Sequence, residues 1–280
     1  MKRRLPFHLA MILFALIAVA VLIYPSANMV LMSFKSPGSG WTLANYREIL
    51  TGSMYTAAIK NSVGISLFSS VVAIVFTTVT TYAIVSHSKK LRETFVVIAN
   101  MTSNFAGIPL AFAYIILLGS SGVLLIFGRR AGIDWLANYN LYSPWGLCIV
   151  YLYFQLPMGI ILLLPIYDAL DKGWRESAEL LGASSFQYWR RIGLPVLMPS
   201  IVGVFAMMFA NAMGAYASAE ALTGTGVNLL SIRIANTVTG DIFARPEIGA
   251  ALSVLLALIL LINMILGDKL AKRAEKVSKG

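Results

Sequence analysis

The chain has 280 residues, of which 58% are hydrophobic and 12% are charged, and its formal net charge is +10. This composition excludes a soluble globular domain, because folded soluble proteins keep a large exposed area that needs polar cover. It also excludes disorder, since disordered chains are poor in apolar residues. The single cysteine, Cys148, excludes a disulfide scaffold, and two histidines leave little material for a metal site. A polytopic membrane protein remains.

Long apolar runs predict an all-α transmembrane bundle, with residues 1–280 forming a single domain. A helix needs roughly 20 apolar residues to cross the hydrocarbon core. A secretory signal peptide is the alternative interpretation of the first run, which follows a basic N-terminus. An uncleaved helix is the simpler interpretation, because the run is long and more spans follow. The six predicted spans are Leu9–Phe34, Ser62–Val85, Phe95–Leu118, Trp145–Tyr167, Val196–Ala219 and Ile248–Gly267.

The distribution of basic residues predicts the orientation of the chain, because Lys and Arg accumulate on the cytoplasmic side of membrane proteins. If the N-terminus is cytoplasmic, the segments on that side hold fifteen Lys and Arg residues, against seven on the other side. We therefore expect both termini to be cytoplasmic. The net charge then orients the chain in the bilayer and requires no nucleic acid as a partner. The basic tail, Asp268–Gly280, is expected to touch anionic membrane lipid.

The predicted spans lack Asp, Glu, Lys, Arg and His, which argues against an ion-driven carrier. A nucleotide-binding P-loop needs a Gly directly before its Lys, and no Gly precedes a Lys in this sequence. No Ser/His/Asp set or paired carboxylates suggest catalysis. We therefore expect that this chain is not an enzyme, that it carries no cofactor, and that any energy input comes from elsewhere.

The segment Asp168–Pro195, between the fourth and fifth predicted spans, is the most informative part of the sequence. A short amphipathic helix is expected from Trp174 onward, with Ala178 and Leu181 on the same face at i, i+4 and i+7 spacing. Gly182 then favours a helix stop, because glycine tolerates a positive φ angle. The segment is therefore expected to be folded.

A second helix is expected over Phe186–Ile192, capped by Ser184 and Ser185 and ended by Pro195. The segment is also expected to expose four aromatic side chains, which would suit a docking surface for another protein. The alternative is a helix pair in the membrane interface, with its aromatic rings at headgroup level. Both interpretations stay open on physical grounds. The four aromatic residues are Trp174, Phe186, Tyr188 and Trp189.

The same segment carries a motif with fixed spacing. Glu176-Ser177-Ala178 is followed by Gly182, then by Ile192, and then by Leu194-Pro195. This pattern resembles the EAA signature of the membrane subunits of binding-protein-dependent ABC importers of type I, with Ser177 in place of the first Ala. A weaker resemblance extends outside the segment, over Lys60-Asn61-Ser62, Thr81-Tyr82-Ala83 and the break at Asn104–Pro109.

The resemblance implies a permease subunit in a bacterial-type inner membrane, with residues 168–195 as a cytoplasmic coupling loop. Its implied partners are two ABC ATPase subunits that hold ATP and Mg, a second similar or identical permease chain, and an extracytoplasmic solute-binding protein. Glu176 is expected to face a basic ATPase residue, and Gly182 to form the turn between the helices. The implied substrates are a polyamine, ferric iron, thiamine or a phosphonate. The expected coupling residues are Trp174, Glu176, Ser177, Ala178, Leu181, Gly182, Phe186, Ile192, Leu194 and Pro195.

Polar residues within or beside the spans are candidates for a solute pathway. Helix packing is the alternative, because small and hydroxyl residues are common at membrane helix interfaces. We favour packing for the stripe of small residues from Ser62 to Thr77. A membrane scaffold that recruits a soluble partner through residues 168–195, or a secondary carrier, is the alternative function. The pathway candidates are Asn104, Gln155, Asn211, Tyr216 and Glu220.

Overall fold

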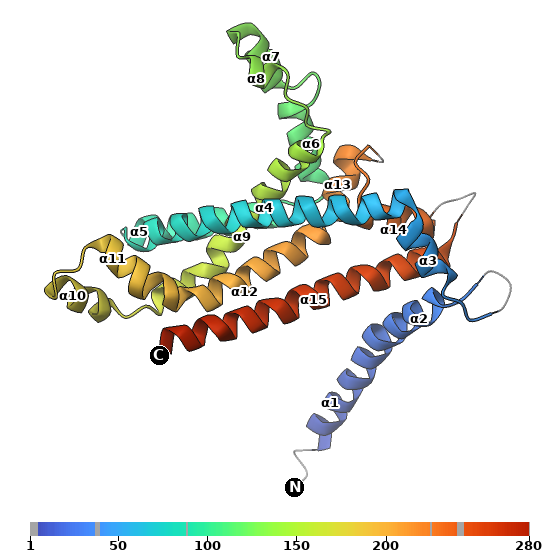
Figure 1. Ribbon diagram of the computed structural model, residues 1–280, viewed down its shortest axis with the longest axis horizontal. Helices are drawn as coiled ribbons and strands as arrows, with labels where there is room; N and C mark the ends of the chain where they lie inside the picture. The colour runs from blue at the N-terminus through green and yellow to red at the C-terminus, as the bar shows by residue number, and fades with distance from the viewer. Residues whose placement is uncertain (1–4, 37–39, 88, 225, 240–243, 280) are drawn as a thin grey trace. The chain divides into compact units, whose positions relative to one another are not determined.

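The computed structural model describes residues 5–36, 40–87, 89–224, 226–239 and 244–279, and helices make up most of this length (Figure 1). No β-strand occurs in these five ranges. The helical elements, with η marking a π-helical turn, are α1 (Leu5–Ala18), η1 (Val19–Ile23), α2 (Tyr24–Ser33), α3 (Ala44–Thr51), α4 (Ser53–Val85), α5 (Lys89–Asn104), α6 (Ile108–Leu118), α7 (Val123–Ala131), α8 (Asp134–Ala137), α9 (Pro144–Asp168), α10 (Lys172–Leu180), α11 (Ser185–Tyr188), η2 (Trp189–Gly193), α12 (Leu194–Met213), α13 (Tyr216–Thr223), α14 (Leu230–Thr239) and α15 (Pro246–Lys279).

Six helical stretches of the described chain are long and apolar enough to cross a membrane, which confirms the predicted all-α fold with six spans. The third stretch lies later in the sequence than the predicted Phe95–Leu118. The reason is that polar residues at 100–104 and a break before α6 interrupt the apolar run. The six stretches are Met11–Ser33, Ser53–Val85, Ile108–Ala131, Pro144–Asp168, Ser185–Met213 and Pro246–Ala274.

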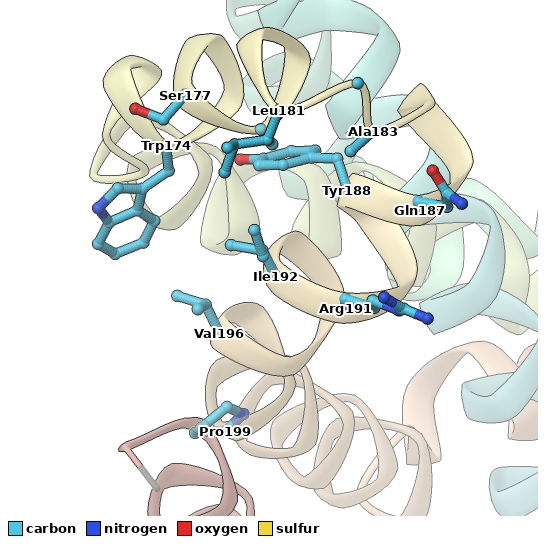
Figure 2. A pocket seen from close by; sticks show the side chains of 12 residues that line it. Trp174, Ser177, Leu181, Ala183, Gln187, Tyr188, Arg191, Ile192, Val196 and Pro199 are labelled. Atoms are coloured by element: carbon cyan, nitrogen blue, oxygen red, sulfur yellow. The ribbon is translucent and has the colours of Figure 1, made fainter.

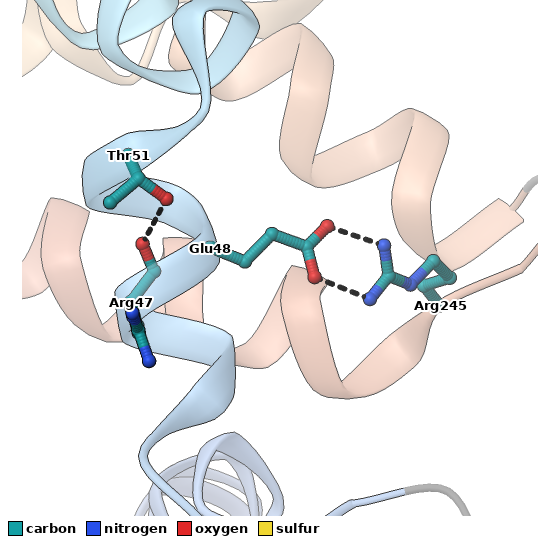
Figure 3. A network of polar contacts seen from close by, with 4 residues as sticks. All are labelled: Arg47, Glu48, Thr51 and Arg245. Carbon is teal, nitrogen blue, oxygen red and sulfur yellow. Dashed lines mark hydrogen bonds and ion pairs between the residues drawn. The ribbon is translucent and has the colours of Figure 1, made fainter.

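The chain forms two compact units, and the first comprises the residues up to Ala58 together with Arg233–Ile259. In this unit the Asn45 amide donates hydrogen bonds to the carbonyl oxygens of Ser33 (2.9 Å) and Lys35 (2.8 Å), so it fastens α3 to the end of α2. The Glu48 carboxylate accepts two hydrogen bonds from the Arg245 guanidinium, at 2.5 and 2.7 Å (Figure 3). These polar contacts hold α3 in place.

The second unit comprises Ile59–Ile232 and the residues from Leu260 onward. Here α5 and α12 pack on α9, and α6 packs on α13. Gly159 of α9 allows the close approach, because a Cβ there would lie 2.0 Å from the Met208 Cε atom and 2.8 Å from the Thr77 Cγ2 atom. The small side chains of α4 from Ser62 to Thr77 are buried, as the packing interpretation requires. This tightly packed bundle supports both candidate sites described below.

Candidate functional site

Local backbone chemistry shapes the α10 helix. Its N-cap is Asp171, whose carboxylate accepts a hydrogen bond from the Gly173 amide at 2.8 Å. At its other end Gly182 has a φ angle of 78°, which confirms the predicted stop. The Gly182 amide donates to the Glu179 carbonyl (3.0 Å), and the Ala183 amide donates to the Ala178 carbonyl (2.9 Å). This pair of bonds is the Schellman arrangement, in which a left-handed residue satisfies the last free carbonyl groups of a helix.

Two reciprocal hydrogen bonds begin the α11 helix. The Ser184 hydroxyl accepts from the Gln187 amide, and the Gln187 side-chain oxygen accepts from the Ser184 amide, so Ser184 caps the helix as predicted. The prediction that Pro195 ends this helix is wrong. The helix continues through η2 into α12, and Pro195 lies in the first turn of α12. The π-helical turn explains this, because it changes the hydrogen-bond pattern just before the residue that lacks an amide hydrogen.

An open groove of about 1060 Å³ lies between the α10 helix and the α11–η2–α12 helix, and we call it the loop groove (Figure 2). Of the ten predicted coupling residues, Phe186, Leu194 and Pro195 lie outside this groove, and Glu176 lines a separate pocket. Six of the ten line the loop groove, namely Trp174, Ser177, Ala178, Leu181, Gly182 and Ile192. The structure therefore gathers most, but not all, of the predicted coupling residues.

Six further groove residues were not predicted. Tyr188, Ile192, Val196 and Pro199 follow one another at helical spacing, so this stripe could have been found by continuing the helix through Pro195. Of the remaining three, Ala183 directly follows Gly182, and Gln187 and Arg191 are polar residues of α11 and η2. The six residues that complete the groove are Ala183, Gln187, Tyr188, Arg191, Val196 and Pro199.

The predicted exposure of four aromatic residues in this segment is only half right. Trp174 and Phe186 are exposed, but Tyr188 is buried and Trp189 is half-buried. The Trp189 ring packs against Tyr82 of α4 and Tyr167 of α9, with centroid distances of 4.6 and 6.1 Å. Both neighbours lie far from Trp189 in the sequence, so periodicity within the segment did not reveal the contact.

Glu176 lines a second pocket of about 540 Å³ on the other side of α10. In the same pocket Arg175 forms an ion pair with Glu179, with an Nε–Oε1 distance of 2.9 Å. The hydrogen bond to Glu179 and an interaction with Tyr82 raise the pKa of the Arg175 guanidinium, so this side chain stays charged. At the pocket edge Asp168 is paired with Arg92 of α5. No group of three potential metal ligands occurs among the residues that the structure describes.

A smaller cavity of about 240 Å³ forms where two helix breaks meet, and we call it the break cavity. The first break precedes α6, where Gly107 has a φ angle of 73°, and the second separates α12 from α13. The Ser218 hydroxyl accepts a hydrogen bond from the Gly107 amide (3.0 Å) and lies 3.3 Å from the Gly107 carbonyl oxygen, to which it donates. Irregular backbone at membrane depth is tolerated where neighbours satisfy its polar groups.

The pathway candidates fall into different environments. Asn211 and Tyr216 line the break cavity, and the Asn211 amide contacts the Met158 sulfur at 3.1 Å. Asn104 donates to the Asn100 carbonyl on the same helix. The fifth predicted span, Val196–Ala219, is interrupted, because α12 ends at Met213. Ser103 and Gly107 from the first break and Ser218 from the second also line the cavity.

The other two candidates are buried in part or in full. The Gln155 amide donates to the Ser69 and Ser70 hydroxyls of α4, at 3.4 and 3.1 Å, and to the Met208 carbonyl of α12 at 3.4 Å. Its side chain is fully buried, so it joins three helices. The Oε1 atom of Gln155 and the Oε2 atom of Glu220 are buried without a hydrogen-bond partner among the described residues.

Comparison with known proteins identifies the family. Residues 82–276 match the family described as "Binding-protein-dependent transport system inner membrane component". The chain belongs to this family. It is therefore a multi-pass membrane protein and the permease subunit of a binding-protein-dependent ABC importer. The match includes α10, Gly182 and both helix breaks.

Relatives are named for chemically different substrates. Trehalose transport system permease protein SugB of Mycobacterium tuberculosis (strain CDC 1551 / Oshkosh) is 26% identical over 73% of this chain and 69% of its own length. The probable sulfate transport system permease protein cysT of Prototheca wickerhamii is 28% identical over 75% of this chain and 80% of its own. Spermidine/putrescine transport system permease protein PotC of Shigella flexneri is 27% identical over 49% of this chain and 50% of its own.

The fold is also similar to a solved structure. A chain of the bacterial alginate ABC transporter, in complex with an alginate pentasaccharide-bound periplasmic protein, superposes with a TM-score of 0.80 at 19% identity. The superposition covers 99% of this chain and 96% of that chain. At this level of identity the similarity concerns the fold alone.

Proposed function

We propose that the loop groove, together with the tip of the α10–α11 segment, docks on a separate ATPase subunit whose ATP hydrolysis drives the permease. Three large apolar side chains form this tip, with exposed fractions of 89% for Leu180, 87% for Leu181 and 73% for Phe186. Such exposed apolar patches mark interaction sites. The observation that carries the proposal is the EAA-type spacing, whose glycine forms the left-handed turn between two helices beside a large groove.

The proposed complex contains two ATPase subunits that bind ATP and Mg, and a second permease chain, identical or similar. It also contains a solute-binding protein on the extracytoplasmic side. The family description and the periplasmic protein in the alginate transporter complex support the binding-protein partner. In this arrangement both termini and the α10–α11 segment are cytoplasmic, and the membrane is of the bacterial inner type. The excess of Lys and Arg on the segments of that side supports this orientation.

We propose that the break cavity belongs to the solute pathway, with Asn211 and Tyr216 in contact with the solute. Discontinuous helices with satisfied backbone groups are typical of transport sites near the bilayer midplane. The proposed substrate is a small solute delivered by the binding protein. The spermidine/putrescine relative supports the polyamine member of the predicted substrate group, whereas relatives named for trehalose and sulfate lie outside that group.

The Gly182→Asp variant tests the docking surface. An aspartate there places a negative side chain at the turn and strains a backbone with φ of 78°. We expect normal membrane insertion, loss of ATPase co-purification and loss of transport. The matched control is Gly132→Asp, because Gly132 also has a positive φ angle of 69° and open space around the new Cβ. The control should co-purify with the ATPase and transport at the normal rate.

The measurements use the permease co-expressed with its ATPase and binding protein, and reconstituted in lipid vesicles. Normal transport by Gly182→Asp would contradict the docking proposal. Wild-type protein that recruits a soluble partner but gives no ATP-dependent uptake would instead support the scaffold alternative. Uptake that survives ATP depletion would support a secondary carrier.

A further inference from the structure

Four aromatic side chains meet beneath the α10–α11 segment, and we call them the aromatic cluster. Trp189 lies at its centre, 4.6 Å from Tyr82, 6.1 Å from Tyr167 and 5.6 Å from Tyr188 between ring centroids. The Tyr82 and Tyr188 rings meet Trp189 nearly edge to face, which is a favoured geometry for aromatic pairs. Because Tyr82 belongs to α4 and Tyr167 to α9, Trp189 joins this segment to two apolar helices of the bundle.

The Trp189 ring packs directly on the backbone of Gly193. A Cβ added at Gly193 would lie 2.6 Å from Cε3 and 2.8 Å from Cζ3 of the indole. The turn between the two residues is π-helical, and such turns often mark functional positions within helices. The indole is therefore fitted between the η2 backbone on one side and the two tyrosines on the other.

The α10 helix borders the same place. Arg175 of α10 forms an ion pair with Glu179 and lines the same pocket as Tyr82 and Trp189. The Tyr167 hydroxyl donates a hydrogen bond to the Thr78 carbonyl of α4 at 2.8 Å. Through Trp189 the segment is therefore attached to the end of α4, and α4 is attached in turn to α9.

We infer that Trp189 is a positioning residue, which transmits movement of the α10–α11 segment to α4 and α9. The inference rests on the proposed function, because it assumes that an ATPase moves this segment. Packed cores change between discrete arrangements and do not deform continuously, so a tightly fitted side chain carries displacement from one element to the next. Trp189 lies outside the loop groove and is not one of the three side chains of the proposed docking tip.

Replacement of Trp189 distinguishes docking of the ATPase from transmission of movement to α4 and α9. In the reconstituted complex with ATPase and binding protein, we expect Trp189→Ala to keep ATPase co-purification within about twofold of wild type, because the groove and the tip remain. Stimulation of ATP hydrolysis by the solute-loaded binding protein should fall by roughly 2- to 30-fold, the range of mutations along coupling networks. Trp189→Phe keeps one aromatic ring and should show a smaller loss. The control is Trp135→Ala, an exposed tryptophan of α8.

A second pair of variants tests the same contact without removing the aromatic cluster. Gly193→Ala places a methyl group against the indole and should reduce the stimulation in the same way. Adding Trp189→Phe to Gly193→Ala removes the indole atoms that this methyl group meets, and should restore part of the stimulation. A defect that came only from lost helix flexibility at residue 193 would not be rescued by the second substitution.

Fluorine labelling gives a direct spectroscopic readout. With 5-fluorotryptophan in the complete complex, the resonance missing from Trp189→Phe identifies Trp189. We expect this resonance to shift when ATP is added and the Trp135 resonance to stay in place. The inference is overturned if the Trp189 resonance does not respond, if Trp189→Ala keeps full stimulation, or if it loses ATPase association. Failure of the proposed function differs from all three, because the wild-type chain itself would then not associate with the ATPase.

Discussion

At the scale of single residues, two glycines act for different physical reasons. Gly182 is required by its positive φ angle of 78°. Space is not the reason, because a Cβ at this position would meet no atom within 4 Å. Gly159 is required by space, because α4 and α12 approach its Cα closely. A left-handed turn follows from the local sequence, whereas close approach depends on helices that are distant in the sequence. The first glycine was therefore predictable and the second was not.

The Gly159→Ala substitution should destabilise the bundle. The added methyl group overlaps the terminal methyl of Met208, which is flexible, and the methyl of Thr77, which is stiff because Thr is branched at Cβ. We expect a loss of about 1–3 kcal/mol, typical of overpacking, seen as a lower unfolding temperature in detergent. Gly203→Ala in α12 is the matched control, since its Cβ would have open space and alanine favours the helix. Equal stability of the two variants would contradict the packing argument.

Chemical labelling separates pathway residues from packing residues. The native Cys148 is buried and is first replaced by alanine. Single cysteines at Asn211 and Tyr216 should react with a small polar thiol reagent, because both positions line the break cavity. A cysteine at Gln155 should stay unreactive in the same state, because that side chain is fully buried. Reaction at Gln155 and none at Asn211 would reverse the assignment.

At the scale of elements, the break cavity is formed by helix ends. The break before α6 and the break before α13 lie far apart in the sequence, yet Ser218 bonds directly to the Gly107 backbone. The continuous α11–η2–α12 helix connects the loop groove with the break cavity, because Ile192 and Asn211 lie on its two halves. A change at the groove therefore has a direct helical route to the proposed pathway.

The ion pair between Glu48 and Arg245 makes the attachment of α3 dependent on pH. Hydrogen bonds from Arg245 hold the pKa of the Glu48 carboxyl below its ordinary value of 4.5. Because the folded-state pKa is lowered, the stabilisation is present above pH 4.5 and is lost as the pH falls through the folded-state value. Both side chains are partly exposed, so we expect at most about 1 kcal/mol.

Thermal unfolding in detergent measured against pH tests this ion pair. Wild-type protein should lose more stability between neutral pH and about pH 3 than the Arg245→Gln variant does. The glutamine removes the charge that lowers the pKa of Glu48, so the variant should have a flatter dependence. Parallel curves for the two proteins would show that the ion pair does not contribute.

At the scale of the whole molecule, the chain is a multi-pass membrane permease. The six apolar stretches and the family match agree on this point. The relatives do not agree on a substrate, since they are named for a sugar, an inorganic anion and polyamines. A shared fold serves different solutes, so the fold does not identify the solute.

Reporter fusions test the proposed orientation. Green fluorescent protein fused after Gly280 should be fluorescent, because the C-terminus is proposed to be cytoplasmic, where this reporter folds. Alkaline phosphatase at the same position should be inactive, and should be active when inserted in the α7–α8 region near Gly132. Active phosphatase at the C-terminus would reverse the orientation. The physical basis is the excess of Lys and Arg on the proposed cytoplasmic segments.

The sequence by itself determined the membrane class, the number of spans, the stop at Gly182, the cap at Ser184 and the family motif. Each depends on apolar run length or on chemistry between residues close in the chain. Only the tertiary structure decided that Tyr188 is buried and Trp189 half-buried, and that the helix continues past Pro195. It also brought the two helix breaks together at Ser218. Contacts with α4 and α9 cover Trp189, and a contact with the break before α6 joins the two breaks. No local pattern records which distant helix a side chain will meet.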